Sequence, residues 1–409
     1  MAHIADSGVG AESNGQRLAR LRARRRWTQQ RLATEAGYSL PAVKAFEQGR
    51  RSLDRPAVIL AFAQALDCHP TEITGAPYVP SHADRDGQDA VASVAAVRRA
   101  LLRHGRPARP TEQEAAAVDL LDLRQRVDEA NRYRQAAALA KSGATLPSLL
   151  RDLQVAAELT DGEQRCEAFE MLASAYECAM QYLYKLGHSS DATLATERVL
   201  WASEETGNPL RVLAARWYDA GEFLTIGEHD EAGAIIDEAL TELGEIRQAC
   251  PEVVSLRGAF HLKASLNLAR ATDTKAALSH LKQAEQAAEE LGEDRNDWQM
   301  QFGPTNTALW AVSLPVEMGR GKEAVARAEK VQLPQGYSRE RHSHFHIDRA
   351  RAYFYNGQRE QAVRAFLEAE RLAPQATRAH AGVRETVGTM IRTQKRGELV
   401  ELGIRLGVV

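Results

Sequence analysis

Helix-forming residues dominate almost the whole of this 409-residue chain, and this bias limits its fold more than any other feature. Ala, Leu, Glu, Gln and Arg are abundant, and apolar residues recur three or four positions apart, as they do on one face of an amphipathic helix. The sequence lacks the alternating Val, Ile and Thr runs, bounded by turn residues, that are typical of strands. We therefore expect an all-α protein.

The length of the chain predicts two or more domains, because a single compact core rarely grows to this size. Pro, Gly and Asp are mixed between residues 75 and 87, a composition that is typical of a linker. Similar breaks occur at residues 105–110 and at residues 296–304. We expect a disordered tail over residues 1–14, a small domain over 15–75, a linker over 76–90 and a large helical domain over 91–409.

The charge of the chain is distributed unevenly between these parts. Residues 15–75 contain 11 basic and 5 acidic side chains, although the whole chain has a net charge of −3. A small basic domain on an acidic body suggests that only the small domain meets a polyanion. The sequence contains no apolar run of membrane-spanning length and no signal peptide, and its four cysteines are scattered, so we expect a cytoplasmic protein that does not contact a membrane.

Residues 15–75 divide into five short amphipathic helices. Thr28 and Ser39 are candidate N-caps of the second and third helices, and Gly37 lies in the turn between them. Pro56 and Pro70 mark the starts of the fourth and fifth helices. Two helices joined by a Gly-containing turn form the helix-turn-helix arrangement.

Three segments of this region together resemble the Xre/Cro/C1 repressor family. They are WTQQRLA at residues 27–33, AGYS at residues 36–39 and the EQGRR run at residues 47–51. The resemblance implies a DNA-binding domain over residues 15–75 that inserts its third helix into the major groove of an operator. The residues that it assigns to DNA contacts are Gln29, Ser39, Leu40, Pro41, Lys44, Gln48, Arg50 and Arg51.

These residues are expected to contact DNA in different ways. Gln29 starts the second helix, where an amide beside the positive end of the helix dipole suits a phosphate. Leu40 and Pro41 occupy positions that are often polar in this family, so we expect apolar contacts to thymine methyl groups there. Lys44 then becomes the main donor to base edges, whereas Gln48, Arg50 and Arg51 lie beside the backbone.

Residues 344–374 contain the clearest unit of an internal repeat in the large domain. Its small and large residues match the tetratricopeptide repeat at Ala350, Tyr353, Gly357, Ala362, Phe366, Ala369 and Pro374. Weaker copies lie upstream, centred on Ala192, Ala232, Ala277 and Ala324. A further, capping pair of helices is expected over residues 112–141 and 146–159. We therefore expect the large domain to be a right-handed α-solenoid of tetratricopeptide-like helix pairs.

The first helix of each repeat lines the concave side of such a solenoid, and this side is where we expect an effector to bind. The candidate effector-binding residues are Gln181, Tyr184, Trp217, Asn306, His344 and Arg351. Two of them have alternative interpretations, because Asn306 could cap a helix and Trp217 could belong to the core. His342 and His346 lie one helical turn apart, but no carboxylate or cysteine completes a set of ligands, so we expect no metal site.

The sequence contains none of the common catalytic motifs, and we expect neither an enzyme nor a cofactor. A head of this type on tetratricopeptide-like repeats resembles actinobacterial regulators and, more distantly, peptide-sensing quorum regulators. This resemblance implies a homodimeric regulator of transcription that binds double-stranded operator DNA, with a short peptide as effector. Two alternatives remain open: the repeats bind a small lipophilic signal, or they are a docking scaffold for another protein.

Overall fold

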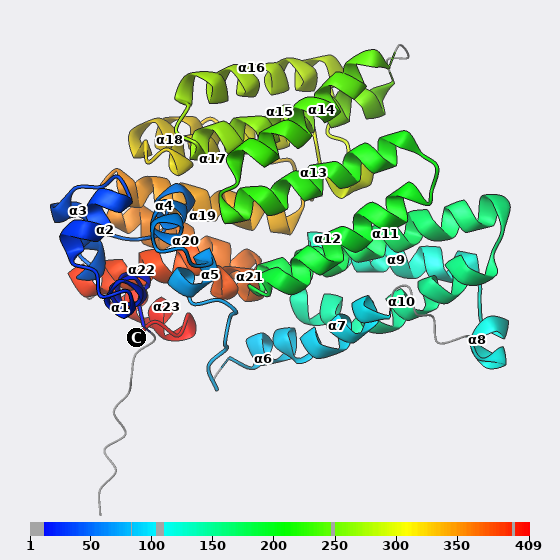
Figure 1. The fold of residues 1–409 in the computed structure, drawn as a ribbon, viewed down its shortest axis with the longest axis horizontal. Coiled ribbons are helices and arrows are strands. Elements are labelled where there is room, and N and C mark those ends of the chain that lie inside the picture. Colours follow the sequence, from blue (N-terminus) through cyan, green and yellow to red (C-terminus); the bar gives the residue numbers. More distant parts are fainter. Residues whose placement is uncertain (1–11, 83, 104–109, 247–249, 395–396) are drawn as a thin grey trace, which may run out of the picture.

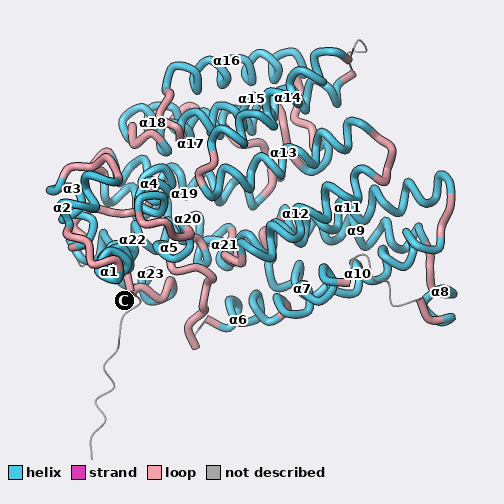
Figure 2. The backbone as a smooth tube through the Cα atoms, viewed as in Figure 1, coloured by secondary structure: helices cyan, strands magenta, loops and turns pink. Residues whose placement is uncertain are grey.

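The structure is a computed structural model, and it describes residues 12–82, 84–103, 110–246, 250–394 and 397–409. Within these ranges every regular element is a helix, which confirms the predicted fold class (Figures 1 and 2). The first five helices form a small domain, here called the head, and the remaining helices form the body. The helices of the head are α1 (Asn14–Arg24), α2 (Gln29–Glu35), α3 (Leu40–Glu47), α4 (Pro56–Ala65) and α5 (Pro70–Thr74).

The caps predicted for the head are present. Thr28 accepts a hydrogen bond from the backbone N–H of Arg31, and Ser39 accepts one from Ala42. Gly37 lies between α2 and α3 with a φ of 71°, a conformation that glycine adopts without strain. Gly15 is needed for a different reason, because a Cβ there would lie 2.0 Å from the carbonyl oxygen of Phe46. This close approach locks α1 against α3.

Six pairs of antiparallel helices form most of the body. In each pair a residue with positive φ lies in the turn, and a buried small residue follows five positions later in the second helix. The helices are α9 (Leu120–Gln135) with α10 (Leu139–Leu159), α11 (Gly162–Lys185) with α12 (Ser189–Glu204), α13 (Pro209–Ile226) with α14 (His229–Glu245), α15 (Pro251–Arg270) with α16 (Thr274–Leu291), α17 (Pro304–Glu317) with α18 (Gly321–Ala328), and α19 (Arg339–Tyr355) with α20 (Arg359–Leu372).

The alanines on which the repeats were centred are all buried in the second helix of a pair. The turn residue is Ala137, Gly187, Gly227, Thr272, Gly319 or Gly357, and the small residue is Ser142, Ala192, Ala232, Ala277, Ala324 or Ala362. Each of these alanines is at most 1% exposed, because a larger side chain would force the helices apart. The predicted helix pairs are thus confirmed, whereas their identity as tetratricopeptide repeats stays a prediction.

Three predicted boundaries differ from the structure. The second helix of the capping pair starts at Leu139 rather than Leu146 and continues through Pro147. Residues 85–90 of the predicted linker belong to α6 (Arg85–Ala92), which is followed by α7 (Val94–Leu102) and α8 (Glu112–Ala116). Of the predicted tail, residues 1–11 lie outside the described residues, and Ser13 caps α1. Most of the break predicted at residues 105–110 also lies outside the described residues.

The body curves until its last helices meet its first ones. It ends with α21 (Pro374–Ala379), α22 (Ala381–Thr393) and α23 (Gly397–Arg405). Arg378 in α21 forms an ion pair of 2.9 Å with Asp84, next to the start of α6, and Ser338 donates a hydrogen bond to the carbonyl oxygen of Gln135 at the end of α9. These contacts close the curve (Figure 1).

The predicted loop before α17 lies on the inner side of this curve. It includes a short 3-10 helix, η1 (Asp297–Gln299), and it contacts the first helices of several pairs. Arg134 of α9 donates to the side chain of Gln299, and the hydroxyl group of Tyr218 in α13 donates to the carbonyl oxygen of Trp298. The concave side of the body is therefore partly occupied by the chain itself.

Candidate nucleic-acid interface and adjoining cavity

One face of the head is exposed although the head is packed against the body. It is formed by the start of α2, by α3 and by the turn after α3 (Figure 1). Ser39, Pro41, Lys44, Arg50 and Arg51 are exposed here, whereas Val43 and Phe46 on the opposite side of α3 are buried in the core of the head. Residues 24–26 add three further exposed arginines at the end of α1.

Glu47 organises the base of this face. Its carboxylate accepts two hydrogen bonds from Arg22, of 2.6 and 3.0 Å, and one of 2.6 Å from the side-chain amide of Gln29. These bonds tie the ends of α1 and α3 to the start of α2. The sequence placed Gln29 at this helix start but did not indicate that Glu47 would hold it there.

The turn after α3 is tightly built. Arg50 donates a hydrogen bond of 2.8 Å to the side chain of Gln48, and the guanidinium of Arg51 lies 4.8 Å from the ring of Phe46. Both arginines keep their charge exposed at the edge of the face. The arrangement suits contacts with phosphate groups on either side of a groove.

The comparison with known families agrees with this geometry. Residues 15–74 match the family model of a helix-turn-helix domain. These residues form a helix-turn-helix domain. The match supports a DNA-binding regulator and covers the head alone. No curated protein matches the chain.

The side of the helix-turn-helix domain that faces away from the exposed face is attached to the body by Asp54. This residue lies between α3 and α4, two positions before Pro56, and is 4% exposed. Its carboxylate accepts a hydrogen bond of 2.6 Å from Tyr355 and one of 3.0 Å from Thr386, and it lies 3.3 Å from the guanidinium of Arg351. Arg351 also lies 3.5 Å from both Glu317 and Asp348. We call Asp54, Arg351, Tyr355 and Thr386 the Asp54 cluster.

Other bonds surround the Asp54 cluster. The backbone N–H of Asn14 donates to Glu385, Gln64 donates to the carbonyl oxygen of Gly227, and Arg392 donates to the carbonyl oxygen of Gly49. The helix-turn-helix domain is thus bonded to α13, to α19 and to α22, which lie far apart in the sequence.

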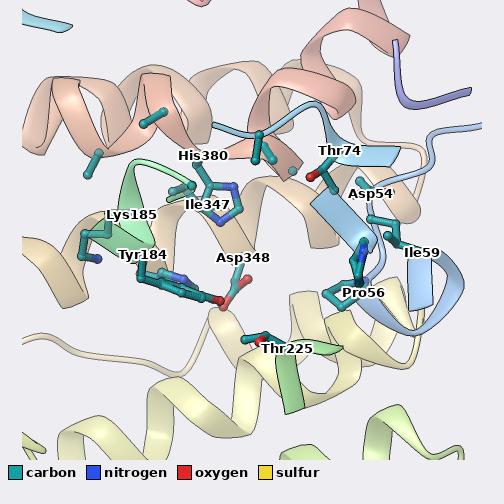
Figure 3. A pocket seen from close by; sticks show the side chains of 18 of the residues that line it. Asp54, Pro56, Ile59, Thr74, Tyr184, Lys185, Thr225, Ile347, Asp348 and His380 are labelled. Atoms are coloured by element: carbon teal, nitrogen blue, oxygen red, sulfur yellow. The ribbon is translucent and has the colours of Figure 1, made fainter. Parts of the chain in front are cut away.

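A cavity of about 430 Å³ lies between the helix-turn-helix domain and the body. The domain contributes residues of α4 and α5, among them Pro56, Ile59 and Thr74, and the body contributes residues from α11, α13, α17, α19 and α21–α22 (Figure 3). Tyr184 projects into this space (Figure 3), and for this reason half of its surface is accessible although it is surrounded by protein.

Four of the six predicted effector residues line this cavity: Tyr184, Asn306, His344 and Arg351. Gln181 is not among the lining residues. Trp217 is not either; its indole N–H donates to the carbonyl oxygen of Ala259, and the ammonium of Lys263 lies 3.5 Å from its ring centre. The core interpretation of Trp217 therefore describes its surroundings better than the effector interpretation does.

Asn306 does not cap a helix, because the N-cap of α17 is Gly303 and Asn306 lies in the first turn. It is only 3% exposed, and its side-chain oxygen has no hydrogen-bond partner. A buried carbonyl oxygen without a partner costs free energy that a ligand donor can restore.

Histidines border the same cavity. His380 accepts a hydrogen bond from the backbone N–H of Val383 and so caps α22. Burial, together with the proximity of His344 and of the Arg351 guanidinium, lowers the pKa of His380 to about 3, so its ring is neutral. His342 and His346 stack on each other, and no group of three or more metal-binding side chains occurs among the residues that the structure describes.

Within the described part of the chain, no helix has the length and hydropathy required to cross a membrane.

Proposed function

We propose that this protein regulates transcription by sequence-specific DNA binding and that an effector in the cavity alters this binding. The observation that carries the proposal is the position of the helix-turn-helix domain between two different surroundings. Its exposed face, formed by α3 and the adjoining turns, is open to DNA, and its opposite side forms a wall of the cavity. A ligand in the cavity therefore contacts the domain that binds DNA.

The polar lining supports binding in this cavity. The side-chain oxygen of Asn306 lacks a partner, and the volume of about 430 Å³ falls within the range of small-molecule sites. An effector shifts the equilibrium only if it binds one position of the head more tightly than another. An effector that contacts both the head and the body would have different affinities for the two positions, because any movement of the head changes these contacts.

DNA binding is proposed to follow the geometry of related domains. Lys44 would donate to base edges beside Ser39, Leu40 and Pro41, and Gln29, Gln48, Arg50 and Arg51 would hold the phosphates. We propose a homodimer on a two-fold operator, with half-sites about 34 Å apart. The mass of the protein–operator complex in solution tests this stoichiometry.

We favour a small lipophilic effector over the short peptide that the resemblance implied. The loop around η1 occupies part of the inner side of the body, so a linear peptide cannot follow the whole concave surface without displacing this loop. The apolar side chains of Ile59, Leu309 and Ile347 line the cavity instead. A docking scaffold, in contrast, would use a broad flat surface and would need no cavity.

The test begins with selection of binding sites from random duplexes by the full-length protein, which identifies an operator. Operator affinity is then measured by fluorescence anisotropy with and without a small-molecule extract of the native cells. We expect a selected sequence and a change in affinity with the extract. Failure to enrich any sequence at low salt would reject the proposal.

A further inference from the structure

One of the five basic side chains that line the cavity lacks an acidic neighbour in the part of the molecule that the structure describes. Four basic side chains of the lining have an acidic neighbour: Lys185 and Arg341 lie 2.6 and 3.5 Å from Glu340, Arg270 lies 3.2 Å from Glu317, and Arg351 belongs to the Asp54 cluster. Arg384 also lines the cavity, but no carboxylate of the described residues lies within ion-pair distance of it. Its Nε atom is buried and has no hydrogen-bond partner.

The surroundings of Arg384 do not compensate its charge. Its guanidinium lies 5.5 Å from the ring centre of Tyr78, which also lines the cavity, and Arg17 is a second positive charge close enough to interact. Burial lowers the pKa of Arg384. A desolvated cation that is neither paired nor fully hydrogen bonded is costly unless an anion joins it.

The acidic side chains of the lining do not present the same deficit. Glu317, Glu340 and Asp348 each lie beside a basic side chain, and Asp54 is saturated by its cluster. The carboxylate of Glu222 accepts hydrogen bonds from Thr193 and Thr196. The lining contains five basic and five acidic side chains, and among the basic ones Arg384 is distinguished because its guanidinium forms neither an ion pair nor a hydrogen bond within the described residues.

We infer that the ligand of this cavity is an amphipathic organic anion, whose carboxylate binds Arg384 and whose apolar part lies between α4 of the head and α17 and α19 of the body. The apolar contacts are provided by Ile59 and Leu60 from the head and by Leu309, Phe345 and Ile347 from the body. Guanidinium groups bind carboxylates through two parallel hydrogen bonds, which gives both affinity and orientation. This inference rests on the proposed function, since it names the chemistry of the effector.

Trp310 lines the cavity and provides a local signal. Brominated ligands quench tryptophan fluorescence on contact, so we would titrate the full-length protein with 8-bromooctanoate and with 8-bromooctan-1-ol, which differ only in the charged end. We expect the carboxylate to bind about tenfold more tightly than the alcohol. The quenching should disappear in Trp310→Phe, which identifies its location among the five tryptophans.

Arg384→Gln is expected to bring the two affinities together while the affinity for the alcohol stays unchanged. Arg371→Gln is the matched control, because Arg371 is exposed, lies outside the cavity lining and pairs with Glu368. If Arg384→Gln fails to fold, the comparison of carboxylate and alcohol on the natural protein still decides. Equal affinities, no quenching by either compound, or an unchanged preference in a folded Arg384→Gln protein would each overturn the inference.

Two further measurements identify the source of the anion and test its role in regulation. Competition by octanoate and by leucyl-leucine distinguishes a fatty-acid-like ligand from the free end of an apolar peptide; displacement by either supports the anion, and displacement by neither opposes it. The titrations contain no DNA, so their outcome is independent of the proposed function. A carboxylate preference with unchanged operator affinity would keep the ligand class and reject the regulatory coupling.

Discussion

The two sides of the helix-turn-helix domain differ in almost every physical property. The face around α3 is exposed and basic, and its side chains can approach a polyanion. The opposite side is packed against the body, and there the buried charge of Asp54 is balanced by Arg351, Tyr355 and Thr386. We therefore expect the exposed face to determine DNA affinity and the buried side to determine where the body holds the domain. Mutations on the two sides should therefore have separable effects.

The largest effect is expected from Arg351→Met, which removes the cation of the Asp54 cluster on the buried side. The substitution leaves the carboxylates of Asp54, Glu317 and Asp348 close together without their shared cation. Removal of one partner from a buried ion pair costs about 3–5 kcal/mol, and we expect the free energy of unfolding to fall by about 4 kcal/mol. Urea denaturation followed by circular dichroism measures it.

Arg371→Met is the control for this prediction. Arg371 lies in α20, the partner helix of α19, and pairs with Glu368, but the pair is exposed, and we expect no measurable change in stability. Similar stability of both variants would show that the Asp54 cluster does not hold the head.

Lys44→Ala tests the exposed face. If Lys44 contacts a base edge, the substitution should reduce discrimination between the selected operator and random DNA by about 1–3 kcal/mol, with no change in stability. Arg50→Ala is the matched variant, and because Arg50 is expected at a phosphate, it should weaken binding to both duplexes equally. Anisotropy titrations at one fixed salt concentration measure both. An equal loss of affinity for operator and random DNA in Lys44→Ala would remove its assigned role.

Acidification should lower the stability of the folded protein. Because the pKa of His380 is lowered to about 3 in the folded protein, the unfolded chain binds more protons between about pH 3 and its usual pKa of about 6.5. The free energy of unfolding therefore falls as the pH falls through this window. Burial also lowers the pKa of His261 and of His346 to about 4, which adds to the same trend.

His380→Asn isolates the contribution of one ring. Asparagine can still cap α22 but does not titrate, so the variant should lose about 1–2 kcal/mol less stability than the natural protein between pH 7 and pH 5. The expected difference is smaller than the whole pKa shift would give, because His380 faces the cavity. Thermal unfolding at a series of pH values measures the difference, and identical pH profiles would contradict the assigned protonation.

The comparison also explains which parts of the molecule the sequence could reveal. Local signals were sufficient for the head and for the helix pairs: Thr28, Ser39 and Pro56 mark helix starts, and Ala192 or Ala362 marks a close helix contact. These features depend on residues only a few positions apart. The boundary at Leu139 was missed, and the helix that starts there contains Pro147 in its interior.

Long-range contacts had no such signal. Asp54 meets Arg351 across 297 positions, and nothing near either residue indicates the other. Tyr184, Asn306 and His344 were predicted from the repeat pattern and do line the cavity, but the pattern placed Gln181 and Trp217 beside them, since it describes one helix face and not the head that closes the cavity. The cavity exists only after the chain has curved back on itself.

The smallest expected effect concerns Asn306 and sharpens the distinction between a residue kept for stability and one kept for a ligand. Its unpartnered oxygen makes the empty cavity less stable, so Asn306→Leu, which removes the polar group at similar volume, should raise the free energy of unfolding by about 1 kcal/mol. Asn267 is the matched control: it is 5% exposed, but its side chain bonds to both the ring and the carbonyl oxygen of His229, so Asn267→Leu should be destabilising. If both variants lose stability in urea titrations, Asn306 has a structural partner and its oxygen is not reserved for a ligand. If only Asn306→Leu gains stability, and effector response is lost with it, the polar group is retained at a cost that only binding explains.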